Sequence, residues 1–245
     1  MITINAKNTN YRTLNELIGK AAKTSKNIKL TNVFGQRYIG RALNENVKIT
    51  VYGTPGNDTA AYMDGAEIEI FGSVQDALAN TMNRGKIIVR GRCGDTAGYA
   101  MRGGEIYIEG SVGYRVGIHM KEYGDSKPVI VAGGSAGDFL GEYMAGGAII
   151  LLGLGLEKGE SITGRFCATG MHGGAVYLYG GTDSFNLGKE AAETNLSPQD
   201  KRFLKKHLTA YAKYFNKDLS LIKIEDFKKY SALNKNPYKN MYCKN

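Results

Sequence analysis

Residues 67–91 read EIEIFGSVQDALANTMNRGKIIVRG, and this stretch contains one full period of a repeat. Two apolar segments, EIEIFG and KIIVRG, are closed by Gly72 and Gly91, which are 19 residues apart. Apolar runs or alternation over four to six residues are typical of β-strands. Gly53 and Gly110 close similar segments and extend the 19-residue spacing in both directions. The chain therefore repeats a strand at a fixed interval.

Other residue types follow the glycines in the same phase. A methionine lies ten residues after the glycine, in a column formed by Met63, Met82, Met101, Met120 and Met144. A small residue lies seven after it, in a column formed by Ala60, Ala79, Gly98, Gly117 and Gly141. An Asn or Asp lies four after it, in a column formed by Asn57, Asp76, Asp95 and Asp138. Short strands in coils of fixed length predict a solenoid whose coils bury each other.

We therefore predict a mainly β fold, a right-handed single-stranded parallel β-helix over residues 35–181. Inward Ile, Val and Met side chains are expected to fill its core. The Asx column is expected to bond nearby backbone in turns. The glycines at the strand ends are expected to be structural, through a positive φ or a close approach of neighbouring backbone. They are Gly53, Gly72, Gly91, Gly110, Gly134, Gly153 and Gly180.

The period lengthens at two places. MKEYGDSKP (120–128) is inserted in one coil and GLGLEKGESITG (153–164) in a later one. Insertions in a solenoid collect on one face, which is often the face that binds something. These insertions are not needed to complete a coil, so we predict partner contacts within them. The residues are Lys121, Glu122, Tyr123, Lys158 and Glu160.

Non-repetitive segments flank the coils. Residues 1–34 predict a short strand, ITI, and a helix from Thr13, whose side chain can cap it, to Ala22, which covers the first open coil. Residues 182–245 predict a basic, partly helical extension with Ser197 as N-cap and Pro198 in the first turn. From Asp183 onward the chain holds 13 of its 32 Lys and Arg but 7 of its 23 Asp and Glu.

Composition excludes several classes of protein. The three cysteines, Cys93, Cys167 and Cys243, lie far apart, which argues against a disulfide framework or a Cys-rich zinc site and favours a reducing cytoplasm. No leader or 18-residue apolar run is present, so we expect neither export nor a membrane span. Lys and Tyr interleave in residues 228–245, a pattern that can bind nucleic acid. The coils are nearly charge-balanced and lack a nucleic-acid-binding motif, so nucleic acid is not the expected partner.

A catalytic pair, a metal site and a phosphate-binding loop can each be proposed from the sequence, but a structural role explains the same residues better. Cys167 and His172 could form a catalytic pair, but a free Cys is more often a small buried hydrophobe. His119 and His172 could bind a metal, but the spacing supplies no third ligand. The glycines of 153–159 could bind phosphate, but neither the lysine–serine pair of a phosphate-binding loop nor a strand-to-helix context accompanies them. We therefore assign no catalytic, cofactor-binding or metal-binding residue to this chain.

The coils GTPGNDTAAYMDGAEIEIFG, GSVQDALANTMNRGKIIVRG and GDTAGYAMRGGEIYIEG resemble the GXGXG domain, the C-terminal β-helix of the large subunit of glutamate synthase. The resemblance covers residues 1–182 and is to the stand-alone version of the domain, found where that enzyme is split into separate chains. The third subunit of formylmethanofuran dehydrogenase is a more distant resemblance. Several coils in register are more specific than any single GxG.

The resemblance implies a non-catalytic scaffold subunit. In the glutamate synthase family, an N-terminal-nucleophile amidotransferase domain releases ammonia, and a separate synthase barrel carries FMN and an iron–sulfur cluster. The β-helix packs between them, so both are expected as partner subunits here. An amidotransferase needs Cys at its mature N-terminus, whereas Met1 and Ile2 stand here, so no glutaminase activity is expected. An accessory subunit of a formylmethanofuran dehydrogenase-like complex, an orphan binding module and self-association remain as alternatives.

Overall fold

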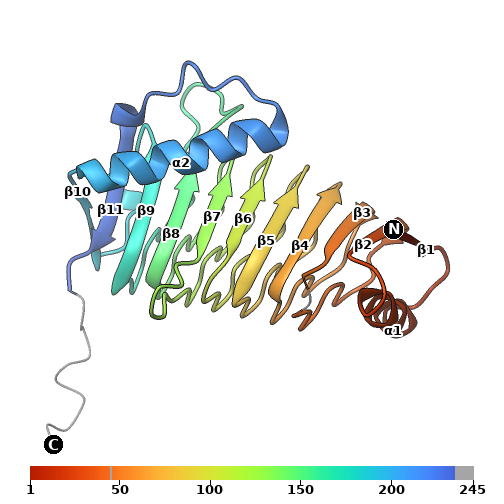
Figure 1. The fold of residues 1–245 in the computed structure, drawn as a ribbon. Helices are drawn as coiled ribbons and strands as arrows, with labels where there is room; N and C mark the ends of the chain where they lie inside the picture. The colour runs from red at the N-terminus through yellow and green to blue at the C-terminus, as the bar shows by residue number, and fades with distance from the viewer. Residues whose placement is uncertain (45, 235–245) are drawn as a thin grey trace, which may run out of the picture.

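A computed structural model describes residues 1–44 and 46–234 of the chain. It confirms the predicted parallel β-helix, but the parallel strands begin before residue 35, where the prediction began the solenoid. Residues 235–245, with Cys243 and much of the Lys/Tyr segment, lie outside the described residues. Nine strands lie side by side in chain order, each parallel to the next (Figure 1). They are β1 (Ile2–Asn5), β2 (Asn27–Phe34), β3 (Lys48–Thr54), β4 (Asp64–Phe71), β5 (Arg84–Val89), β6 (Glu105–Ile108), β7 (Val129–Ala132), β8 (Ala145–Leu151) and β9 (Gly173–Tyr179).

The register stacks identical side chains inside the solenoid. One buried row runs through seven isoleucines and ends on a valine, each paired with the next strand. The row is Ile28, Ile49, Ile68, Ile87, Ile106, Ile130, Ile149 and Val176. The methionine column is fully buried in the same core, which confirms its predicted role as filler. Each coil is therefore covered only by its neighbours.

The Asx column bonds differently from the prediction. Asp76 Oδ1 accepts the backbone N–H of Asp95 at 2.9 Å, and Asp95 Oδ1 accepts that of Tyr114 at 2.9 Å. The acceptor therefore serves the next coil rather than its own turn. Neighbouring coils lie about 4.8 Å apart, a spacing that a short side chain can bridge. These side chains thus link coils in addition to shaping corners.

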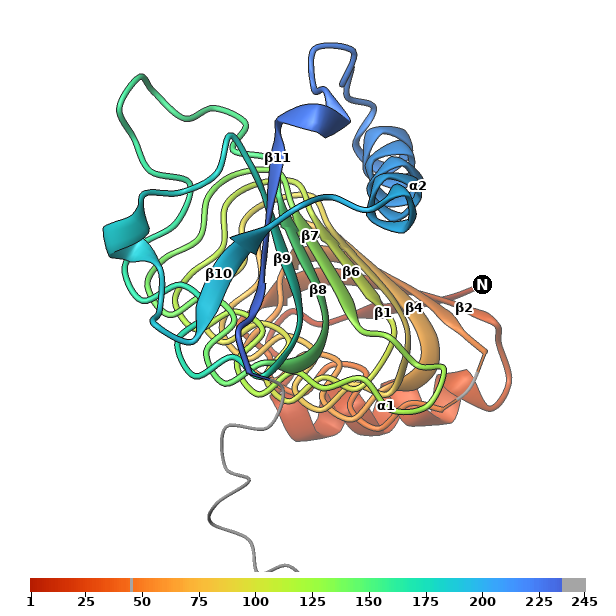
Figure 2. The same cartoon turned by 90° about the vertical axis from the view of Figure 1, so that its left-hand side faces the viewer.

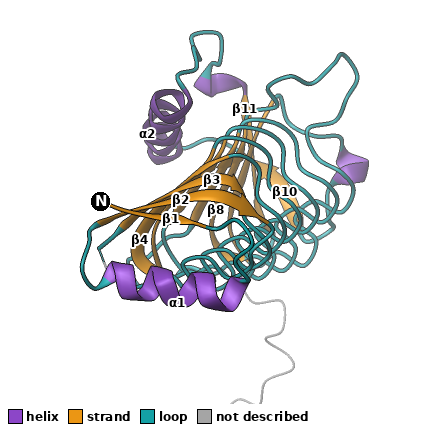
Figure 3. Ribbon diagram, turned by 90° about the vertical axis from the view of Figure 1, so that its right-hand side faces the viewer, coloured by secondary structure: helices purple, strands orange, loops and turns teal. Residues whose placement is uncertain are grey.

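The N-terminal end is closed by α1 (Tyr11–Ala22), which connects the first two strands and lies on the other side of the sheet from α2 (Figure 3). Its N-cap is Asn10 and not Thr13 as predicted, because the Asn10 side chain accepts the backbone N–H groups of Arg12 and Thr13. Leu14 and Ile18 are buried in the solenoid core, so the predicted covering of the first coil is confirmed.

The C-terminal end is closed by the chain's own extension. It contains β10 (Ala191–Thr194), α2 (Pro198–Phe215), β11 (Phe227–Ala232) and the short 3-10 helices η1 (Ser184–Asn186) and η2 (Ile224–Asp226). β11 pairs antiparallel with β9, and β10 pairs with β11, so the last parallel strand is not an open edge. The predicted Ser197 N-cap and the Pro198 position are confirmed, and Asp200 completes a capping box.

Helix α2 packs on the outer face of the sheet, over the later strands (Figure 2). Its Leu204, Leu208 and Tyr211 are buried there in one cluster with residues of β5 to β9. The sheet is thus covered on both faces along β5 to β9, which explains why these strands read as nearly continuous apolar runs.

Candidate functional site

A polar cluster lies between α2 and the sheet. Tyr107 Oη donates to Glu105 and lies 2.8 Å from Nδ1 of His207, and Lys206 is paired with Glu105. His207 is 1% exposed, and this burial lowers its pKa to about 4. A neutral imidazole is therefore part of the interface that holds α2 in place.

We expect acid to loosen this interface. Between pH 6.5 and about 4 the unfolded chain binds a proton at His207 that the folded chain does not bind, so stability falls as pH falls through this window. Chemical denaturation at pH 7 and pH 4.5 measures the loss. His207→Gln, which does not titrate, should show a smaller difference between the two pH values. Equal losses in both proteins would contradict the assignment.

The predicted contact residues Lys121, Glu122 and Tyr123 lie in a loop before β7. Tyr123 is 79% exposed and exchanges backbone hydrogen bonds with Ser126, which makes the loop a tight hairpin. Glu122 accepts the N–H of Gly147 at 3.2 Å and anchors the loop to the next coil. Lys121 and Tyr123 line a groove of about 610 Å³ whose other cationic residues are Arg84 and Arg102.

The other two predicted residues lie elsewhere. Lys158 is exposed, and the Glu160 carboxylate accepts the N–H of Glu157 at 2.9 Å to close a turn. The insertion at 153–164 follows the carboxyl end of β8, whereas residues 121–128 precede the amino end of β7. The two loops therefore lie at opposite ends of the parallel strands (Figure 2). The expectation that insertions share one face is wrong here, because each lengthens a different corner of its coil. Partner contact at either loop stays a prediction.

The described residues that could suggest cysteine or histidine chemistry, Cys167, His172 and His119, lie in ordinary structural surroundings. Cys167 is fully buried, and burial raises its pKa to about 12, so its thiol is not a nucleophile at neutral pH. His172 Nδ1 lies 3.1 Å from the carbonyl oxygen of Gly170, and the His119 ring stacks on Tyr143 at 5.3 Å between centroids. Within residues 1–44 and 46–234, no three His, Cys, Asp or Glu side chains cluster as metal ligands.

The earlier strands carry an exposed row of aromatic and cationic side chains on the outer face. Tyr52 and Phe71 stack with centroids 4.8 Å apart, with Lys29 over one ring and Arg90 over the other. The two rings are 40% and 38% exposed. We call these four residues the cation–aromatic row. Helix α2 covers β5 to β9, so this part of the face stays open.

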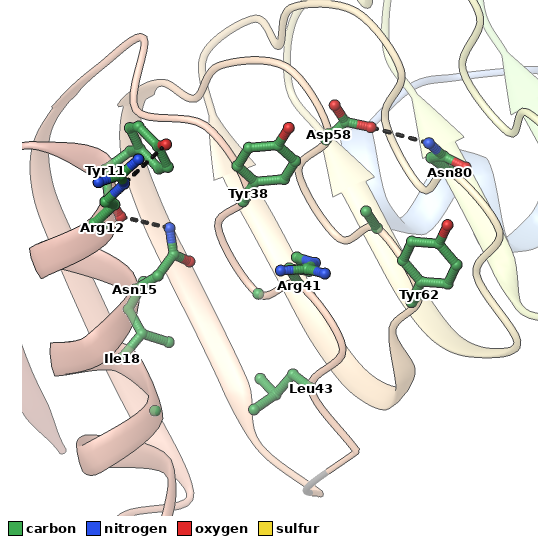
Figure 4. A pocket seen from close by; sticks show the side chains of 13 residues that line it. Tyr11, Arg12, Asn15, Ile18, Tyr38, Arg41, Leu43, Asp58, Tyr62 and Asn80 are labelled. Atoms are coloured by element: carbon green, nitrogen blue, oxygen red, sulfur yellow. Dashed lines mark hydrogen bonds between the residues drawn. The ribbon is translucent and has the colours of Figure 1, made fainter.

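A pocket of about 730 Å³ lies between α1 and the first three coils (Figure 4). We call it the α1 pocket. Tyr11, Arg12 and Asn15 line it from the helix. The coils contribute Tyr38, Arg41, Asp58, Tyr62 and Asn80.

The family of the chain follows from comparison with known proteins. The model of the family described as GXGXG motif matches residues 15–235. The chain belongs to the GXGXG family. An uncharacterized protein of Methanocaldococcus jannaschii is 46% identical over 222 residues, which are 88% of this chain and 85% of that protein. The similarity to this relative therefore extends well beyond single coils.

The surfaces of this GXGXG chain were only partly visible in its sequence. The stacked pair Tyr52 and Phe71 could have been predicted, because each residue precedes one of the periodic glycines and occupies an outward position of its strand. The α1 pocket has a weaker signal at Tyr62, a bulky residue at a corner position that holds Ala42 and Thr81 in the flanking coils. None of the described helices combines the length and the apolar character needed to cross a membrane.

Proposed function

We propose that this GXGXG chain is the non-catalytic scaffold subunit of a cytoplasmic glutamate synthase-type complex. It joins an amidotransferase chain to a synthase chain, and the synthase chain carries FMN and the iron–sulfur cluster. The observation that carries the proposal is membership of the GXGXG family over residues 15–235, nearly the whole chain. Such a subunit acts through its surfaces, because ammonia must pass between partners held in a fixed relation.

The division of the outer sheet face supports this role. The chain covers β5 to β9 with its own α2 and leaves the cation–aromatic row uncovered. Aromatic and Arg side chains are enriched at protein interfaces, where they bury large areas at low entropic cost. We therefore place one partner contact at Tyr52 and Phe71.

Native purification from the source organism tests the subunit assignment. The tagged chain is expected to recover an amidotransferase chain and an FMN-containing chain, identified by mass spectrometry and by the flavin spectrum. Recovery of molybdopterin-binding subunits instead would indicate a formylmethanofuran dehydrogenase-like complex. Recovery of the chain alone, or with RNA, would refute both assignments.

The same purification tests the docking surface. Tyr52→Ser combined with Phe71→Ser should lower recovery of one partner about tenfold or more, since two neighbouring aromatic anchors are lost. Tyr114→Ser is the matched control, because Tyr114 is 51% exposed and lies outside the row. If the double variant retains both partners as well as the control does, the row is not the interface.

A further inference from the structure

The α1 pocket holds two cationic groups, Arg12 and Arg41. Arg12 projects from the first turn of α1 and Arg41 from the coil after β2 (Figure 4). Neither forms a salt bridge with a carboxylate among the described residues, and both are exposed. Guanidinium groups donate two parallel hydrogen bonds to phosphate or carboxylate oxygens. The pocket is therefore suited to an anion.

Aromatic rings line the same pocket. Tyr38 and Tyr62 lie in the left-handed backbone region, at φ 62° and 58°, a conformation that costs a bulky residue about 1 kcal/mol. The corner that holds Tyr38 is filled by Asp58 and then Ala77 in the next two coils, and the corner that holds Tyr62 is filled by Ala42 and Thr81 in the flanking coils. A later coil again places rings at these two corners, Phe139 and Tyr143. Tyr62 is 50% exposed, so its ring is open to a planar ligand. Aromatic faces of this kind stack nucleic-acid bases without sequence preference.

A polar pair completes the lining. Asn80 Nδ2 donates to Asp58 Oδ1 at 3.0 Å, which fixes the carboxylate at the wall of the pocket. In many nucleotide sites a fixed carboxylate accepts hydrogen bonds from the ribose hydroxyls. Arginines, tyrosines and a carboxylate together match the three parts of a nucleotide. An acidic peptide would match the arginines but not Asp58.

We propose that the α1 pocket binds a nucleoside monophosphate. Its base stacks on the exposed Tyr62 ring, its ribose hydroxyls donate hydrogen bonds to Asp58, and its phosphate is held by Arg12 and Arg41. The volume of about 730 Å³ lies within the range of roughly 300–1,000 Å³ found for small-molecule pockets. This function does not depend on the subunit role proposed above, so either can fail while the other holds.

Isothermal titration calorimetry on the full chain tests the proposal with AMP, GMP, CMP and UMP. At least one monophosphate is expected to bind about tenfold more tightly than its nucleoside or inorganic phosphate, because only the monophosphate engages both the rings and the arginines. Arg41→Gln and Tyr62→Asn should each weaken binding about tenfold, and Asn accepts the left-handed backbone. Matched controls are Arg102→Gln, an exposed arginine outside the pocket, and Tyr143→Asn, at the equivalent corner of a later coil.

Three results would overturn the proposal. One is that no monophosphate binds at millimolar concentration. Another is that binding survives Arg41→Gln unchanged, a substitution of an exposed side chain that leaves the fold intact. The third is binding of single-stranded oligonucleotides without binding of monophosphates. Tyr62→Phe keeps the ring and is expected to retain binding, so it separates loss of stacking from loss of structure.

Discussion

Replacing Gly53 with alanine is expected to destabilise the chain by about 3–5 kcal/mol, in the range of the most severe single substitutions. Gly53 is the second-to-last residue of β3, with φ 121°, which alanine rarely adopts, and a Cβ there would overlap the carbonyl oxygen of Val33 in the preceding coil. That obstacle is backbone, so it moves only if the two coils separate. Separation would break the parallel pairing of β2 with β3 and expose the isoleucine row.

Gly180→Ala is the matched control for this prediction. Gly180 also ends a strand segment with a positive φ, but no atom lies within 4 Å of the position of its Cβ. Its substitution should therefore cost only the left-handed conformation, about 1 kcal/mol. Thermal unfolding followed by circular dichroism compares the two, and hydrogen exchange of β2 and β3 locates the damage. Equal melting temperatures for the two variants would show that coil contact does not fix this glycine.

The sequence reveals the solenoid because its evidence is periodic and local. The strand segments and the methionine column return every 19 residues, and a β-helix places such residues directly above one another. The hydrogen bonds between neighbouring coils are harder to predict from the sequence. Asp76 could equally bond its own turn or the N–H of Asp95, and only the stacking distance decides between them.

The missed surfaces depend on contacts between distant segments. The apolar face of α2 is readable at Leu204, Leu208 and Tyr211, but its docking place on β5 to β9 follows from the path of residues 182–197. The helix α1 begins before the predicted Thr13 because Asn10 and Thr13 are both good N-caps, and the structure uses Asn10. Leu14 and Ile18 reach the core from a helix capped by Asn10, and that tertiary contact is absent from local sequence.

Asp200→Ala is expected to detach α2 and destabilise the chain by about 3–5 kcal/mol. The carboxylate accepts the hydroxyl of Tyr177 at 2.5 Å, the backbone N–H of Ser197 at 2.8 Å and the Lys229 ammonium group at 2.9 Å. It therefore joins α2 to β9 and β11. Without it, the buried Tyr177 hydroxyl and the largely buried Lys229 ammonium lose their partner, and the capping box opens.

The pH dependence of this contact has a definite sign. Burial alone would raise the pKa of Asp200, but hydrogen bonds from Ser197, Tyr177 and Lys229 hold that pKa well below its usual range. The stabilisation is therefore present above the unfolded pKa of about 4 and is lost as pH falls further, below the window of His207. Asp200→Ala should remove this acid-dependent loss. Asp218→Ala, at an exposed turn where the carboxylate accepts only the N–H of Ser220, should leave most of the loss in place. Limited proteolysis of residues 182–234 measures whether α2 has detached. If Asp200→Ala is cleaved no faster than Asp218→Ala, the Asp200 carboxylate does not hold the helix, and α2 depends on its apolar face alone.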